Sequence, residues 1–147
     1  MARFMSTPPT PHRPDEVRAD ERDDHAMAVL PRDRRSAVDA RDWLREFLAA
    51  RVPVALVEDA LLVLSELATN ALRHGLGEVV VRVELEHGGT LQLSVTDSGS
   101  ELPALQPVDP TRVGGLGLRI VDELSARWGV AAFPGGKTVW ATLRPPD

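Results

Sequence analysis

The chain has 147 residues, 43% of them hydrophobic and 27% charged, which is typical of one globular domain with its own core. Its net charge of −5 comes without a basic stripe, which argues against direct nucleic-acid binding, and the absence of cysteine excludes disulfides and thiolate metal sites. No apolar run approaches the roughly 18 residues of a membrane span, and no charged-then-apolar signal pattern opens the chain, so we expect a cytoplasmic protein.

Residues 1–26 are rich in Pro, Asp, Glu and Arg and nearly lack large apolar side chains. Such a segment cannot bury enough surface to order itself, so we predict a flexible tail followed by one domain over residues 27–147. The first apolar run, residues 26–30, predicts an edge strand that Pro31 ends. Residues 36–50 then show the apolar spacing of a helix.

Residues 57–74 predict a long amphipathic helix. Apolar side chains recur at about 100° per residue and form one stripe, namely Val57, Ala60, Leu61, Leu64, Ala68, Ala71 and Leu72. Pro53 suits the first turn before this segment, and Gly75 suits the C-terminal cap after it.

The second half of the chain reads mainly as strands. Residues 78–86 and 90–97 alternate between apolar and polar side chains, which predicts a β-hairpin. Residues 98–113 predict a loop and residues 117–127 a helix, and two more strands are predicted over residues 130–133 and 138–143. The order β-α-α-β-β-α-β-β predicts an α+β fold, a two-layer sandwich with a mixed, mostly antiparallel sheet and helices on one face.

Three polar residues follow one another at four-residue steps along the margin of the apolar stripe. Glu66 lies on its polar side, Asn70 at its border and His74 just inside it. Asparagine is a poor mid-helix residue, so Asn70 needs a partner, and a Mg²⁺ ion bridging phosphates would be one. Glu66 would then polarise a water or hydroxyl nucleophile near a γ-phosphate. The alternatives are a solvated Glu66, a hydrogen-bonded border Asn70, and a His74 that only stabilises the helix C-terminus.

Asp97 continues the inward phase of Leu91, Leu93 and Val95. A core-facing carboxylate is costly without a hydrogen-bond donor, and an adenine amino group is such a donor. The alternative is an Asx turn over Ser98 and Gly99, which is common at strand ends.

Gly114, Gly115 and Gly117 precede a predicted helix. Missing Cβ atoms let backbone approach phosphates, and a helix N-terminus favours anions, although a glycine-rich hinge is an equally good interpretation. The Walker pattern and the Rossmann glycine fingerprint are both absent, so the sequence indicates a different nucleotide pocket.

These motifs together resemble the GHKL ATPase superfamily, which includes histidine kinase catalytic domains, gyrase-type ATPases and Hsp90. Residues 66–74 resemble its N box, and residues 97–99, 115–118 and 136–138 resemble its three glycine boxes. The runs Arg127-Trp128-Gly129 and Gly136-Lys137-Thr138-Val139-Trp140 are similar to the single-domain, anti-sigma-factor serine kinase branch common in actinobacteria. The resemblance covers residues 27–143.

The resemblance implies a histidine-kinase-like ATPase fold, bound ATP and Mg²⁺, and a catalytic role for Glu66. It implies that Asn70 holds the metal, that Asp97 binds adenine and that Thr138 lies near the base. The implied nucleotide-binding residues are Asn70, His74, Asp97, Gly99, Gly115, Gly117, Leu118 and Thr138. Kinases of this branch phosphorylate a serine of an anti-anti-sigma partner and otherwise sequester a sigma factor, usually as homodimers.

Two departures favour an alternative function. Ser100 stands where the first glycine box usually has a second glycine, and the lid over residues 101–113 is short, proline-rich and free of glycine. A non-catalytic module of the same fold, holding ATP or nothing and acting by sequestration, would tolerate both. A histidine kinase catalytic fragment is less favoured, because no phosphoacceptor-helix segment precedes the domain.

Overall fold

Three helices and six strands make up the described part of the chain. The structure is a computed structural model, and it describes residues 18–21, 24–100 and 117–146. The elements are β1 (Arg18–Glu21), β2 (His25–Leu30), α1 (Ser36–Leu48), α2 (Val54–His74), β3 (Val79–Leu85), β4 (Leu91–Asp97), α3 (Gly117–Leu124), β5 (Arg127–Phe133) and β6 (Gly136–Leu143). None of the described helices combines the length and the apolar character needed to cross a bilayer.

The strands form one sheet in the order β1-β2-β3-β4-β6-β5. Every neighbouring pair among the described strands is antiparallel, so the predicted parallel component is absent from this part of the chain. The β5–β6 hairpin places β6, its second strand, beside β4. Residue Asp97 at the end of β4 therefore lies opposite Lys137 near the start of β6.

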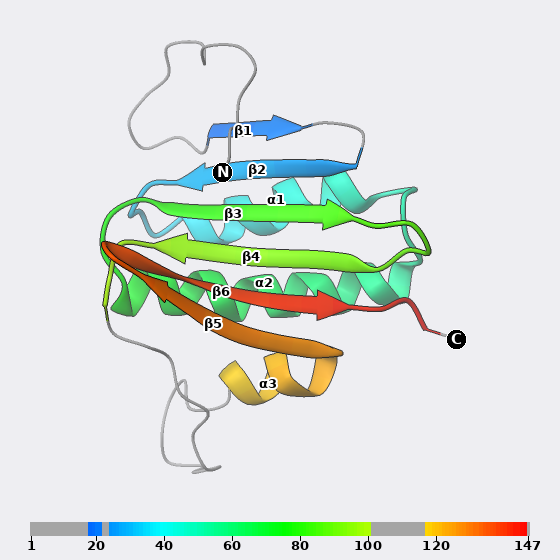
Figure 1. Cartoon of the computed structure of the whole chain (residues 1–147). Coiled ribbons are helices and arrows are strands. Elements are labelled where there is room, and N and C mark those ends of the chain that lie inside the picture. Colours follow the sequence, from blue (N-terminus) through cyan, green and yellow to red (C-terminus); the bar gives the residue numbers. More distant parts are fainter. Residues whose placement is uncertain (1–17, 22–23, 101–116, 147) are drawn as a thin grey trace, which may run out of the picture.

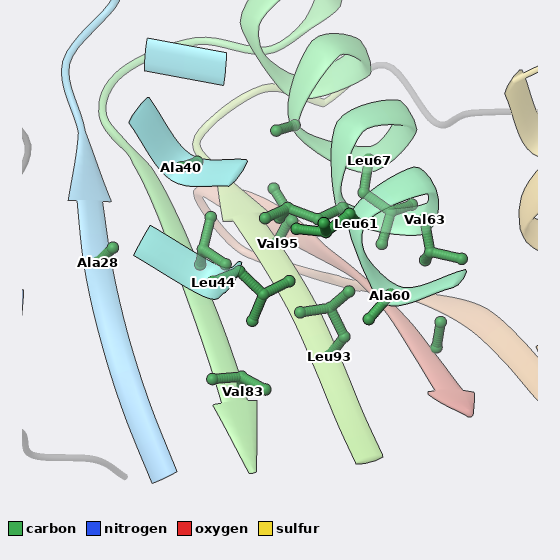
Figure 2. Packing of buried hydrophobic residues seen from close by; sticks show 14 of the residues in the cluster. Ala28, Ala40, Leu44, Ala60, Leu61, Val63, Leu67, Val83, Leu93 and Val95 are labelled. Carbon is green, nitrogen blue, oxygen red and sulfur yellow. The ribbon is translucent and has the colours of Figure 1, made fainter. Parts of the chain in front are cut away.

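The helices lie on one face of the sheet, as predicted for a two-layer sandwich (Figure 1). Alternate residues of the strands point toward α1 and α2 and form the core with them (Figure 2). In α2 the buried face is wider than the predicted stripe, because Leu56, Val63 and Leu67 are buried too. None of the described helices covers the opposite face of the sheet, which we call the open face.

The N-terminal boundary of the domain is a correction to the predicted tail. Residues 18–21 form β1, and their backbone pairs with β2 from Arg18↔Val29 to Glu21↔Ala26. A polar segment can join a sheet because the ladder uses backbone groups and needs no apolar side chain. As a result β2 is an inner strand instead of the predicted edge, while residues 1–17 lie outside the described residues.

The C-terminal elements also differ in their limits from the prediction. The last helix ends at Leu124 instead of residue 127, and β5 begins at Arg127 instead of residue 130. The reason is pairing, because Arg127 opposes Thr142 of β6 and the Ala126 amide donates to the Thr142 carbonyl at 2.8 Å. The predicted loop over residues 98–113 falls mostly outside the described residues.

Candidate functional site

The helix α2 carries the three polar residues of the predicted N box. Asn70 is half-buried, in agreement with its predicted border position. Glu66, predicted on the polar side of the stripe, is half-buried too and lies one turn earlier on the helix. His74 is exposed and is the last residue of α2, so the expectation that it lies just inside the apolar stripe is wrong. An exposed His74 at the last position of α2 fits the alternative interpretation, in which a basic residue stabilises the C-terminus of the helix.

Asp97 is a buried carboxylate at the end of β4. Its side chain faces the helices, as its phase predicts, and the residue is 3% exposed. Its Oδ1 atom accepts two hydrogen bonds, one from the Gly99 amide at 2.6 Å and one from Lys137 Nζ at 2.9 Å. The first is the Asx turn that the sequence offered as an alternative. Among the described residues, both donors to this carboxylate use Oδ1.

Two glycines make room for the Asp97 carboxylate. A Cβ atom on Gly75 would overlap this side chain, and one on Gly99 would lie 2.9 Å from Asp97 Oδ1 and 2.9 Å from Gly75 Cα. Gly75 follows α2 as its cap, as predicted, but its φ of −91° is open to any residue. Close approach to Asp97, and not a left-handed backbone, is therefore what requires glycine at position 75.

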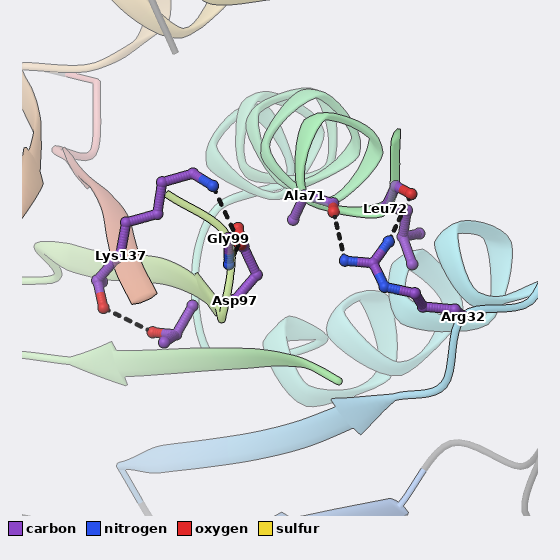
Figure 3. A network of polar contacts seen from close by, with 8 residues as sticks. Arg32, Ala71, Leu72, Asp97, Gly99 and Lys137 are labelled. Carbon is purple, nitrogen blue, oxygen red and sulfur yellow. Dashed lines mark hydrogen bonds and ion pairs between the residues drawn. The ribbon is translucent and has the colours of Figure 1, made fainter. Parts of the chain in front are cut away.

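Lys137 is a site residue that the sequence interpretation missed. It is 4% exposed, opposes Asp97 in the strand register and forms a buried ion pair with it (Figure 3). A signal was available, because Lys137 shares the alternating phase of Val139, Ala141 and Leu143, which face the core.

Thr138 does not join Asp97 in the structure. Its Oγ1 atom hydrogen-bonds Thr96 Oγ1 at 2.7 Å, and both side chains lie on the sheet face opposite to Asp97 and Lys137. One residue along a strand reverses the side-chain direction, so the structure separates Thr138 from Asp97, and the role of Thr138 near adenine stays a prediction. Lys137, and not Thr138, is the β6 residue that contacts Asp97.

Arg32 fastens the C-terminal end of α2 from the other side (Figure 3). Its Nη1 atom donates to the Leu72 carbonyl at 2.6 Å and its Nη2 atom to the Ala71 carbonyl at 3.0 Å. The Ala71 carbonyl also accepts from the Gly75 amide at 2.9 Å, whereas Leu72 lies in the last turn, where internal donors run out. This end of the helix carries its negative charge, so a guanidinium fork is well suited there. The same end of α2 thus contacts Arg32 and, through Gly75, the Asp97 carboxylate.

The second predicted glycine box is only partly described. Gly117 is the first residue of α3, and Leu118 is buried in the core at 6% exposure. Gly114 and Gly115 lie outside the described residues, as does the predicted lid over residues 101–113.

The residues of α2 fit a shared magnesium ion better than a protein-only metal site. The described residues contain no group of three His, Cys, Asp or Glu side chains that could hold a metal. Mg²⁺ commonly takes one or two protein oxygens and fills its other positions with water and phosphate. The half-buried amide of Asn70, with Glu66 one turn away, meets that requirement when a nucleotide supplies the phosphates.

Comparison with known proteins adds independent findings. The sequence matches the histidine kinase-like ATPase domain family over residues 30–143. The crystal structure of the RsbU and RsbW domains of Rv1364c from Mycobacterium tuberculosis is similar, with 25% identity and a TM-score of 0.65 over 82% of this chain and 32% of that chain. This chain therefore spans about a third of that protein's structure.

The fold recurs in a second solved structure. The histidine kinase domain of the blue-light activated histidine kinase from Erythrobacter litoralis EL346 is 22% identical, with a TM-score of 0.50 over 74% of this chain and 58% of that chain. A search of curated proteins gives no match.

Proposed function

The chain belongs to the histidine kinase-like ATPase domain family, and on that premise we propose that it is an ATP- and Mg²⁺-dependent serine-protein kinase that regulates a sigma factor. In this proposal it phosphorylates a serine of an anti-anti-sigma partner and otherwise sequesters the sigma factor, as a cytoplasmic protein and a possible homodimer. The similarity to a structure that contains an RsbW domain supports this branch of the family.

The observation that carries the nucleotide part is the environment of Asp97. Asp97 is 3% exposed, and the described residues supply it with two donors, both to Oδ1, so its second oxygen, Oδ2, can accept from a ligand donor. The adenine amino group is such a donor, and Gly75 and Gly99 keep side chains away from this carboxylate. We therefore assign Asp97 to adenine.

The chemical part rests on α2. In the proposed mechanism Asn70 holds Mg²⁺, which neutralises charge on the phosphates when it is bound. Glu66 accepts the proton of the substrate serine hydroxyl. The serine oxygen then bonds to the γ-phosphorus, and the bond between the γ-phosphorus and ADP breaks. We further assign His74, Gly99, Gly115, Gly117 and Leu118 to the walls of the nucleotide pocket by motif.

Nucleotide binding is tested first, by calorimetric titration of ATP with and without Mg²⁺. Asp97→Asn keeps the shape of the side chain and its acceptor for the Gly99 amide but changes the pattern offered to adenine, so we expect a large loss of ATP affinity. Asn70→Ala should weaken binding only when Mg²⁺ is present. Glu66→Gln should bind ATP as the wild type does, because its role lies in the chemical step.

Kinase activity is tested on the natural partner. Proteins captured from the native cell extract would be incubated with labelled ATP and either the wild type or Glu66→Gln. Label on a captured partner with the wild type alone supports the kinase. A stable sigma-factor complex with no label under any condition overturns it.

The second candidate is a sequestration module without kinase activity. Ser100 and the glycine-free residues 101–113 favour it, because a lid without glycine has less backbone freedom to close over phosphates. The labelling experiment separates the two functions, since a module of this kind would capture its partner but leave it unlabelled.

A further inference from the structure

Lys137 and Asp97 form an ion pair in which both partners have spare hydrogen-bonding capacity. The side chains are 5% and 2% exposed, and Nζ lies 2.9 Å from Oδ1. A lysine ammonium has three N–H donors, and within the described residues one of them is used, on Asp97. Within the described part of the chain, Asp97 Oδ2 therefore accepts no hydrogen bond, and two N–H groups of Lys137 Nζ donate none.

Stability alone is a weak reason for such a pair. Burying two charges costs several kcal/mol of desolvation each, and well-packed apolar residues often replace a buried ion pair without loss. Gly75 and Gly99 let the carboxylate pack against the backbone at the point where α2 meets the sheet. An acceptor and a donor are therefore present together at one end of the sheet.

Adenine matches these groups at two neighbouring atoms. Its 6-amino group is a donor, and the ring nitrogens on either side of that group, N1 and N7, are acceptors. We infer that Lys137 is a specificity-determining residue that donates to the adenine ring nitrogen beside the amino group held by Asp97. This inference rests on the proposed ATP binding and deepens it, because it names a second residue on the same face of the sheet that recognises the base.

The pair would then select adenine by its pattern of donor and acceptor. A site built to hydrogen-bond a group rejects an analogue that lacks this group, because the buried protein atom is left without a partner. Removing the acceptor nitrogen should leave the Lys137 ammonium unsatisfied, and removing the amino group should leave Asp97 Oδ2 unsatisfied.

The test is a titration of the full-length chain with ATP analogues. In 1-deaza-ATP and 7-deaza-ATP a C–H group replaces N1 or N7, and purine riboside triphosphate lacks the 6-amino group. We expect the wild type to bind one deaza analogue roughly tenfold more weakly than ATP. In Lys137→Met this ratio should fall to about one, while Thr96→Val, on the opposite face, should keep the wild-type ratio.

The outcomes separate this inference from the proposed function. If the wild type binds both deaza analogues as tightly as it binds ATP, Lys137 does not donate to the adenine ring, and the inference fails while ATP binding stands. Equal affinity for GTP would also overturn it, because the selection of adenine is lost. No binding of ATP at all overturns the proposed function itself. Titration of the wild type alone decides between these outcomes, even if Lys137→Met fails to fold.

Discussion

Strands β4 and β6 carry two polar pairs one residue apart, and these pairs face opposite sides of the sheet. On the helix side Asp97 and Lys137 form an ion pair that is almost completely buried. On the open face the neutral hydroxyls of Thr96 and Thr138 share a 2.7 Å hydrogen bond and are only half-buried. Both pairs are cross-strand neighbours in the same register.

The two pairs differ in what they cost the fold. Two half-buried hydroxyls keep access to water, so their hydrogen bond stabilises the sheet by a modest amount. Two buried charges give up their hydration, and their attraction only roughly offsets that loss. The open-face pair is explained by sheet formation alone, whereas the inner pair needs a further role, which we assign to the nucleotide.

Removing one charge of the inner pair should have the largest effect. We expect Lys137→Met to lower the free energy of unfolding by roughly 3–5 kcal/mol, because Asp97 is left buried without its partner. Urea unfolding measures the change. The double variant Asp97→Asn/Lys137→Met should recover part of it, since the amide oxygen still accepts from Gly99. A loss below about 1 kcal/mol in Lys137→Met would show that the ion pair contributes no more to the free energy of unfolding than the Thr96–Thr138 hydrogen bond.

Gly75→Ala should come next. Its methyl group would overlap the Asp97 carboxylate, so the helix end and the strand end must separate, at about 1–3 kcal/mol of stability. The same shift should weaken ATP binding. Leu76→Ala is the control, because Leu76 is 64% exposed and its truncation should change stability by less than about 0.5 kcal/mol. If Gly75→Ala has wild-type stability and wild-type ATP affinity, close packing of the end of α2 against Asp97 is not required for either property.

Arg32→Ala tests the other contact with the end of α2. Loss of its two hydrogen bonds should cost about 1–2 kcal/mol, which is moderate because the guanidinium is partly exposed. Arg32→Lys is the matched control: it keeps a positive charge near the helix C-terminus but cannot form the fork, so thermal unfolding should place it between the wild type and Arg32→Ala. Equal stability of the two variants would contradict a role for the fork.

The open face should respond least. Thr138→Val removes one half-buried hydrogen bond, and we expect a loss of about 0.5–1.5 kcal/mol with no change in ATP affinity. Calorimetric titration measures the affinity. A drop comparable to that of Asp97→Asn would restore the motif-based assignment of Thr138 to the base and reduce the contrast between the two faces.

The sequence predicted the inward position of Asp97 but not its partner. The alternation of Leu91, Leu93 and Val95 is a local pattern, and it extends to Asp97 without any knowledge of the fold. The partner lies 40 residues away and is brought in by the β4–β6 register, which no local pattern contains. The assignment of Thr138 to adenine followed motif position, whereas strand phase places its side chain on the opposite face from Asp97.

The sandwich and most of its elements were predictable because the apolar periodicity of the strands and of α2 is strong. The strand β1 was not, since its residues are polar and only its backbone joins the sheet. The two hydrogen bonds from Arg32 to the end of α2 could not be predicted either, because their acceptors are backbone carbonyls that any sequence provides.

Lys137 is the only lysine in the chain, and it is buried. Amine-directed reagents therefore have one side-chain target, and the rate at which that target is labelled reports how often this end of the sheet opens to solvent. The N-terminal amine serves as an internal reference for reagent strength. A single mass measurement over time would thus follow local breathing of the site separately from global unfolding, without any engineered probe.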